Sequence, residues 1–149
     1  MDYQKVIFVT EADTSRGPLA AAVLQKLLGI TNIVSESRGL VVLFQEPTNA
    51  KTVAIAASKG FDLSKYASIQ LCEEDFGKDV LVLVLDETDK QKVYDNFKEA
   101  VNVYSLQEFI NEPGKVSDPY GGELADYGKM YEDLEQMLRK LVMKLKYNN

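Results

Sequence analysis

The sequence predicts an α/β fold: a three-layer α/β/α domain built on a four-stranded parallel sheet. Residues 79–86 are almost continuously apolar and β-branched, which is typical of a central parallel strand buried on both faces. Residues 4–28 have the pattern of a strand, a polar loop and an Ala/Leu-rich helix. Strand-like and helical segments alternate along the rest of the chain, and this alternation is typical of parallel βαβ units.

The bounds of each element follow from local signals. Pro18 suits the first turn of a helix because that position needs no N–H, and Gly29 and Gly60 mark the ends of two helices. Residues 123–147 carry apolar side chains at alternating steps of three and four, which predicts a long amphipathic helix packed on the sheet. We expect strands at 4–9, 31–35, 79–86 and 101–104, and helices at 18–28, 50–59, 87–99 and 123–147.

One apolar stretch has no clear place in this scheme. Residues 40–44, Leu-Val-Val-Leu-Phe, follow the second predicted strand and precede Pro47. Two interpretations fit it: a buried loop or strand extension, or an exposed patch that binds a partner. We expect the buried one.

Length and composition limit the class of protein. The 149 residues suit a single domain over 1–149, and the net charge of −6 argues against nucleic acid or an anionic membrane as partner. No apolar stretch approaches about 20 residues, so we expect a cytoplasmic protein. The chain has no His and one cysteine, Cys72, which excludes an internal disulfide and a multi-cysteine metal site. We expect Cys72 to be a half-buried residue at the start of a short helix, without a catalytic role, and we expect no cofactor.

The loop at residues 10–17 has the composition of an anion site. It joins a predicted strand to a helix N-terminus, where free backbone N–H groups and the helix dipole favour negative charge. Arg16 could add a two-pronged contact to an oxyanion.

This loop resembles the phosphate-binding loop (P-loop) of the low-molecular-weight protein tyrosine phosphatases. In that family a nucleophilic Cys, five residues, Arg and Ser-Pro follow an apolar strand near the N-terminus. Arg16 and Pro18 match the pattern, whereas Thr10 occupies the Cys position. The remaining departures are Ala12 at a family Gly, Asp13 at a family Asn, Ser15 at a second frequent Cys, and Gly17 at the Ser.

The resemblance continues along nearly the whole chain. It includes residues 37–39 (Ser-Arg-Gly), 85–87 (Leu-Asp-Glu) and 117–122 (Ser-Asp-Pro-Tyr-Gly-Gly). Thr14 and residues 104–109 look most like the bacterial branch that includes protein-arginine phosphatases. The implied site residues are the catalytic positions Thr10, Arg16 and Asp118, with Asp118 at the general acid, and the loop Glu11, Ala12, Asp13, Thr14, Ser15, Arg16 and Gly17.

These departures from the family pattern predict that the chain has lost the phosphatase reaction. The family needs a thiolate that exists at neutral pH, and the hydroxyl of Thr10 has no comparable anion. Glu11 and Asp13 also place negative charge beside the position of a phosphate dianion, each costing a few kcal/mol at ~4–6 Å and an effective dielectric near ~20. We expect Arg16 to form an internal ion pair with Asp13, Glu11 or Asp118 instead of binding an anion.

Three functions are compatible with these residues. The first, which we favour, is a pseudophosphatase that binds a phosphoprotein, another protein or a phosphorylated ligand. The second is an active protein-tyrosine or protein-arginine phosphatase with Thr10 as nucleophile, Arg16 as clamp and Asp118 as acid. The third is a receiver-like module in which carboxylates at one sheet edge hold Mg²⁺, although Arg16 among them argues against a metal. The carboxylates of this third hypothesis are Glu11, Asp13, Asp86 and Asp118.

Overall fold

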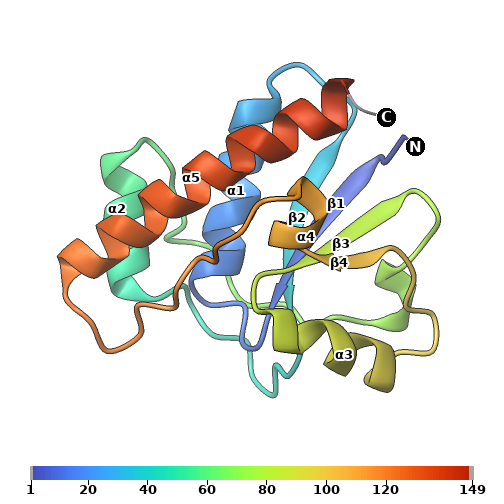
Figure 1. The fold of residues 1–149 in the computed structure, drawn as a ribbon. Helices are drawn as coiled ribbons and strands as arrows, with labels where there is room; N and C mark the ends of the chain where they lie inside the picture. The colour runs from blue at the N-terminus through green and yellow to red at the C-terminus, as the bar shows by residue number, and fades with distance from the viewer. Residues whose placement is uncertain (1, 148–149) are drawn as a thin grey trace.

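The computed structural model describes residues 2–147 (Figure 1). Strands and helices alternate along it, as the sequence predicts. The ends of the predicted domain, residues 1 and 148–149, lie outside the described residues. The strands are β1 (Lys5–Thr10), β2 (Val34–Gly39), β3 (Val80–Val84) and β4 (Val103–Ser105). The helices are α1 (Arg16–Leu28), α2 (Ala50–Ser58), α3 (Glu87–Asn96), α4 (Leu106–Ile110) and α5 (Leu124–Tyr147), with a short 3₁₀ turn, η1, at Glu73–Asp75.

The strands form one four-stranded sheet in the order β2-β1-β3-β4, and all three neighbouring pairs are parallel. This confirms the predicted four-stranded parallel sheet. The strand β1 lies inside the sheet, so that Phe8 stands opposite Ser37 on one side and Leu83 on the other. Ligand sites in open parallel sheets lie outside the carboxyl ends of such strands, which is where β1 ends at Thr10.

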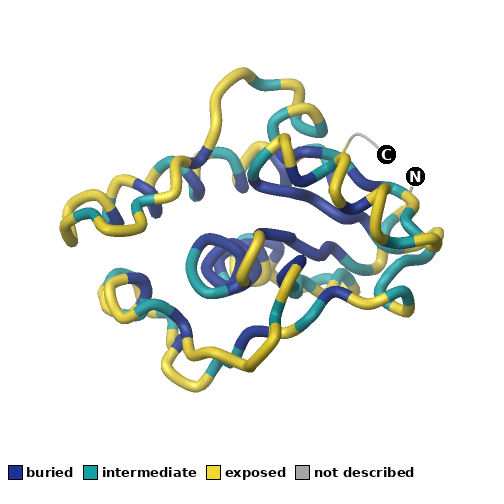
Figure 2. The backbone as a smooth tube through the Cα atoms, turned by 90° about the horizontal axis from the view of Figure 1, so that it is seen from below, coloured by how far each residue is buried: buried dark blue, intermediate teal, exposed yellow. Residues whose placement is uncertain are grey.

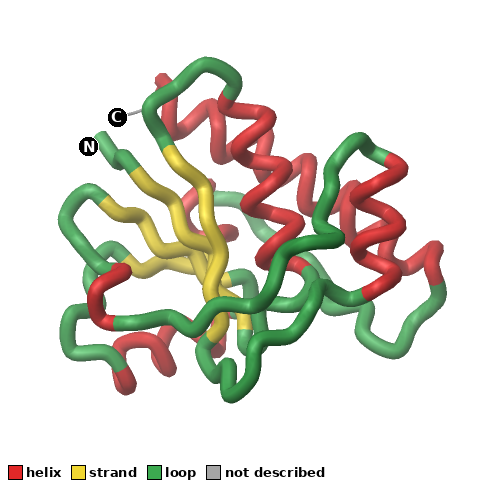
Figure 3. Tube along the Cα trace, turned by 180° about the vertical axis from the view of Figure 1, so that it is seen from behind, coloured by secondary structure: helices red, strands yellow, loops and turns green. Residues whose placement is uncertain are grey.

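Two hydrophobic layers sandwich the sheet. Side chains alternate along β1: Val6 and Phe8 pack with α1 and α5, whereas Ile7 and Val9 pack on the other face with Val93 of α3. Figure 3 shows the strands between these two groups of helices. The central strands β1 and β3 and the helix α1 are the most continuously buried parts of the chain (Figure 2), and α1 packs against both the sheet and α5. The first turn of α1 is therefore held on a rigid core.

Three details differ from the expected elements. Strand β2 runs from Val34 to Gly39, beyond the predicted 31–35, because it pairs with the whole length of β1. Helix α4 was not predicted; it is one short turn of helix capped by the hydroxyl of Ser105. Cys72 is exposed, so the prediction of a half-buried residue was wrong, although it does precede the short turn η1.

The expectation of a buried stretch at 40–44 was wrong for most of its residues. Leu40 is buried, but Val41, Leu43 and Phe44 are 55%, 83% and 82% exposed. The backbone explains the difference: the N–H groups of Leu40 and Val41 donate to the carbonyls of Thr10 and Glu11, at 3.0 and 3.1 Å. The stretch therefore continues beside the loop at 10–17, beyond the sheet, where no further layer covers it.

Within residues 2–147, no helix combines the length and the apolar character needed to span a membrane.

Candidate functional site

The loop at residues 10–17 joins the carboxyl end of β1 to the first turn of α1. Thr10 is buried at the end of the strand, and its Oγ1 accepts a hydrogen bond of 3.1 Å from the N–H of Asp13. Asp13 has φ of 59°, a left-handed conformation that Asn and Asp tolerate better than most residues. The chain can therefore turn sharply and enter α1 at Arg16.

A cavity of about 360 Å³ opens over this loop. Its walls come from the loop, from the segment before α2 and from the segment before α5. The lining residues are Thr10, Glu11, Ala12, Asp13, Thr14, Ser15, Arg16, Glu46, Pro47, Asn49, Asp118, Tyr120 and Tyr127. The structure thus brings the predicted loop residues 10–16 and Asp118 together around one hollow, while Gly17 lies outside its lining.

Arg16 forms an internal ion pair, but its main partner is a residue that we had not predicted for this role. Nη1 and Nη2 donate to the two carboxylate oxygens of Asp86 at 2.8 and 2.7 Å, and Nη1 also donates to the carbonyl of Val116 at 3.0 Å. Asp118 is at 3.9 Å from Nη2, at the limit of an ion pair, and neither Glu11 nor Asp13 is within pairing distance of Arg16. The hydrogen bond from Arg16 lowers the pKa of Asp86, which keeps this carboxylate charged.

Asp13 turns away from Arg16 and into the protein. Its Oδ2 accepts hydrogen bonds from the hydroxyl of Tyr66 at 2.5 Å and from the N–H of Ile69 at 3.0 Å, and Tyr66 also contacts Ser37. Its Oδ1 is buried, with no partner among the described residues, and lies 3.2 Å from where a Cβ on Gly17 would stand. Burial raises the pKa of Asp13, against the opposing effect of these hydrogen bonds. Burial and the bond to Asp13 also raise the pKa of Tyr66, so the phenol stays a donor.

This buried cluster could not be predicted from the sequence, because Tyr66 lies 53 positions from Asp13 and belongs to no recognisable motif. Its effect on the loop is nevertheless direct. Asp13 is tied to the segment before η1, and the loop conformation depends on that tie.

The backbone of the loop keeps part of an anion-binding arrangement. In the described part of the chain, the N–H groups of Glu11, Ala12, Thr14 and Ser15 donate to no protein acceptor, in contrast with that of Asp13. They lie at the N-terminus of α1, whose dipole adds about half a positive charge. The side chains around them carry the opposite sign, because Glu11, Glu46 and Asp118 are exposed beside the same cavity.

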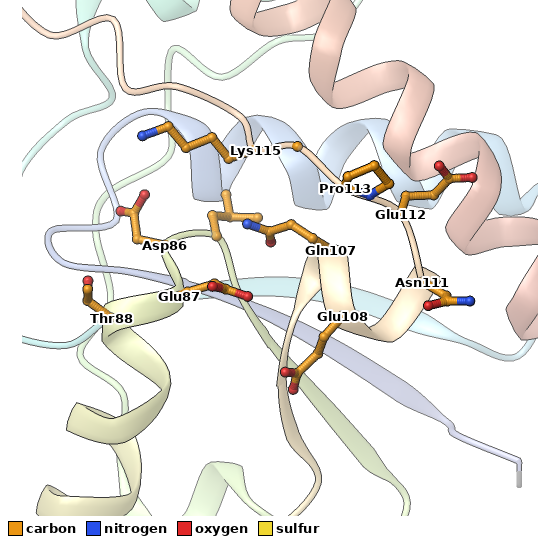
Figure 4. Close-up of a pocket in the computed structure, with 11 residues that line it drawn as sticks. Asp86, Glu87, Thr88, Gln107, Glu108, Asn111, Glu112, Pro113 and Lys115 are labelled. Atoms are coloured by element: carbon orange, nitrogen blue, oxygen red, sulfur yellow. The ribbon is translucent and has the colours of Figure 1, made fainter.

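A second, larger cavity of about 820 Å³ also includes Asp86 in its lining. Figure 4 shows Asp86, Glu87 and Thr88 at the start of α3 on one side, and Gln107 and Glu108 of α4 facing them across the hollow. Residues 111–115 complete its rim (Figure 4). Asp86 therefore contributes to two hollows, and its carboxylate is committed to Arg16.

The structure does not assemble the acidic residues of the Mg²⁺ hypothesis. Among residues 2–147, no group of three or more His, Cys, Asp or Glu side chains is placed to hold a metal ion. Asp13 faces Tyr66, Asp86 faces Arg16, and Glu11 lies 3.8 Å from the ammonium of Lys92.

Comparison with known proteins agrees with the fold. Residues 5–149 match the family described as low molecular weight phosphotyrosine protein phosphatase. The chain is 26% identical over 137 residues to the low molecular weight protein-tyrosine-phosphatase PtpB of Staphylococcus haemolyticus, covering 92% of this chain and 96% of the relative. The PtpB of Staphylococcus aureus is 28% identical over 137 residues, with the same coverage.

Solved structures give the same result. A YwlE mutant from Bacillus subtilis superposes with a TM-score of 0.88 at 28% identity, covering 96% of this chain and 99% of that one. A Cys-to-Ser mutant of the YwlE arginine phosphatase with a phosphorylated active site serine superposes with a TM-score of 0.86 at 27% identity, covering 97% of each chain. The family match spans almost the whole chain, and the chain belongs to the low molecular weight phosphotyrosine protein phosphatase family.

Proposed function

We propose that this family member is a pseudophosphatase: it keeps the fold and the loop of the phosphatases, does not turn over phosphate esters or phosphoarginine, and acts by binding. The partner is a protein or a phosphorylated ligand. One observation carries the proposal: the residue at the end of β1, where the resemblance places the nucleophile, is Thr10. A threonine hydroxyl is a weak nucleophile unless a base removes its proton.

The surroundings of Thr10 supply no such base. The chain contains no His, and the one hydrogen bond recorded for the Thr10 hydroxyl is accepted from a backbone N–H. The carboxylate of Asp13 accepts hydrogen bonds from Tyr66 and Ile69 through Oδ2, and among the described residues no hydrogen bond joins its other oxygen, Oδ1, to the hydroxyl of Thr10. A hydroxyl that only accepts a hydrogen bond keeps its proton.

The electrostatics of the cavity support the same conclusion. In a phosphatase loop the arginine stabilises the charge of the transferring phosphoryl group. Here two N–H groups of the Arg16 guanidinium donate hydrogen bonds to Asp86, and a third donates to the carbonyl of Val116. A phosphate dianion would have to compete with Asp86 for Arg16 while it approaches Glu11 and Asp118.

A second candidate has one observation in its favour. The YwlE mutant with a serine in place of the cysteine is described as phosphorylated on that serine. The hydroxyl of Thr10 would take the phosphoryl group of an aryl phosphate or a phosphoarginine: a new P–O bond forms, the P–O or P–N bond of the donor breaks, and the hydroxyl proton ends on the departing phenol or guanidine. The product would be a stable phosphothreonine, which amounts to a single transfer without turnover.

The test is an assay with an aryl phosphate and with a phosphoarginine peptide, read out both as released inorganic phosphate and as the intact mass of the protein. We expect no phosphate above the level given by Thr10→Ala. A gain of one phosphoryl group that Thr10→Ala lacks would support the second candidate. Steady release of phosphate that disappears in Thr10→Ala would overturn the proposal.

A further inference from the structure

We propose that the cavity over the loop recognises a positively charged side chain, an unphosphorylated arginine or lysine, presented by a protein segment with apolar residues beside it. This inference deepens the proposed binding function and rests on it. It names a partner of opposite charge to the phosphate group for which the fold is known.

The charges around the cavity are the first argument. Its lining contains four carboxylates, Glu11, Asp13, Glu46 and Asp118, and one cationic side chain, Arg16. The positive charge of Arg16 is matched by Asp86, which is not part of this lining. Even if Asp13 is set aside because it faces Tyr66, more negative than positive charge remains at the entrance.

The three entrance carboxylates have little internal compensation. In the described part of the chain, Glu46 has no basic group within 4.0 Å, and Asp118 reaches only Arg16, at 3.9 Å. Glu11 has Lys92 at 3.8 Å, with both side chains more than half exposed. Exposed pairs of this length contribute little, so these carboxylates are available to a cation from outside.

An apolar rim stands next to these carboxylates. Leu43 and Phe44, which shortly precede Glu46 in the sequence, are 83% and 82% exposed, and Tyr120, which lines the cavity, is 85% exposed. The N–H of Val41 donates to the carbonyl of Glu11, so the segment that carries Leu43 and Phe44 begins beside the loop at 10–17. Exposed large apolar side chains gathered at a cavity mark a contact surface for another protein.

Charge and shape together select the occupant. The stem of an arginine or lysine is aliphatic and its head is cationic, so it can lie along apolar side chains while the head meets carboxylates. The ring of Tyr120 could also face the cation. The unpaired N–H groups of the loop carry partial positive charge, so a cationic head group would be held away from them, between the exposed carboxylates of Glu11, Glu46 and Asp118.

The test uses fluorescence anisotropy with three labelled peptides that share a sequence of small and apolar residues. The central residue is arginine in the first, citrulline in the second and phosphotyrosine in the third; citrulline has the shape of arginine without its charge. We expect the arginine peptide to bind at least about tenfold more tightly than the other two. Its binding should weaken as salt is added, because the charges are near the surface.

Variants locate the binding. Glu11→Gln, Glu46→Gln and Asp118→Asn together should weaken the arginine peptide by about tenfold, and Phe44→Ser should weaken it through the rim. The matched control is Glu99→Gln, an exposed residue in the loop before β4, at the amino end of the strands and away from the cavity. Glu99→Gln should leave the affinity for the arginine peptide unchanged.

Equal binding of the arginine and citrulline peptides, or no binding of either, would overturn the inference and leave the proposed lack of turnover untouched. Tighter binding of the phosphotyrosine peptide would also overturn it, and would support a phosphorylated ligand instead. Release of phosphate from that peptide would contradict the proposed function itself, which makes the two failures distinguishable.

Discussion

The guanidinium of Arg16 and the carboxylate of Asp86 meet through two hydrogen bonds of 2.8 and 2.7 Å, although 70 positions separate them in the sequence. Arg16 belongs to the first turn of α1, and Asp86 directly precedes α3. The side chain of Arg16 is only 6% exposed, so Asp86 compensates a positive charge that is largely removed from solvent. The pair therefore ties the loop at 10–17 to the neighbouring strand-to-helix connection.

Removing Arg16 should weaken the folded protein even without a ligand. Arg16→Ala leaves Asp86 without its partner, and we expect the free energy of unfolding to fall by about 1–3 kcal/mol. The lower half of this range is more fitting because the side chain of Asp86 is 40% exposed. Urea unfolding measures the change. Arg139→Ala, whose side chain is 63% exposed, is the control and should change stability by less than about 0.5 kcal/mol. An equal change in the free energy of unfolding for the two variants would show that the Arg16–Asp86 pair does not stabilise the fold.

Restoring the nucleophile alone should recover little activity. In Thr10→Cys the carboxylates of Glu11 and Asp13 still line the cavity and repel a phosphate dianion, and Gly17 offers no hydroxyl to stabilise the new thiolate. A variant that combines Thr10→Cys, Ala12→Gly, Asp13→Asn and Gly17→Ser should hydrolyse an aryl phosphate about tenfold faster or more, because it removes one charge and adds a hydrogen-bond donor. Initial rates at saturating aryl phosphate and equal protein concentration compare the two variants. A single variant as active as the combined one would show that only the thiol was missing.

Asp13 should make stability depend on pH. Burial raises its pKa above the ordinary 3.8, so the folded protein keeps this proton to a higher pH than the unfolded chain does. The contribution of Asp13 to stability therefore falls as the pH rises from 3.8 through its folded value.

Asp13→Asn removes this titration, and its amide oxygen can still accept the bonds from Tyr66 and Ile69. We expect the stability of Asp13→Asn relative to the wild type to be higher at about pH 7 than at about pH 4. Chemical unfolding of both proteins across this range measures it. A difference that stays constant with pH would mean that Asp13 does not titrate in this way.

Gly39 should not tolerate a side chain. A Cβ there would lie 2.6 Å from Cγ2 of Val42 and 3.0 Å from the backbone carbon of Ala12, so Gly39→Ala would push against the loop itself. We expect a loss of about 1–3 kcal/mol in stability. At Gly77 the nearest atom to such a Cβ is 3.6 Å away, which makes Gly77→Ala the matched control. Thermal unfolding of the two variants tests the close approach, and similar melting temperatures would contradict it.

The sequence was sufficient for the fold and for the position of the loop. The apolar run at 79–86 and the alternation of strands and helices depend on local patterns, and the structure places both as expected. The partner of Arg16 depends instead on which carboxylate the third strand brings beside α1. Local patterns showed that Asp86 lies at the correct sheet edge, but they could not distinguish it from Asp118 or Glu11 as the partner of Arg16.

The rim of the cavity was wrongly predicted for a similar reason. Leu43 and Phe44 belong to a run of apolar residues, and such runs are usually buried. Whether another layer covers them depends on the path of the chain beyond the sheet, which the backbone hydrogen bonds of Leu40 and Val41 determine. The buried cluster of Asp13 and Tyr66 was missed because it joins two segments that share no sequence pattern.

We propose that Arg16, because it is paired with Asp86, is not free to bind inorganic phosphate in the loop at 10–17. Thermal melting of the wild type and of Arg16→Ala, with and without inorganic phosphate at matched ionic strength, tests it most directly. We expect phosphate to leave the melting temperature of the wild type nearly unchanged, and Arg16→Ala to melt lower in both conditions. A wild-type melting temperature that rises with phosphate concentration, by mass action, and a loss of that rise in Arg16→Ala would contradict the claim.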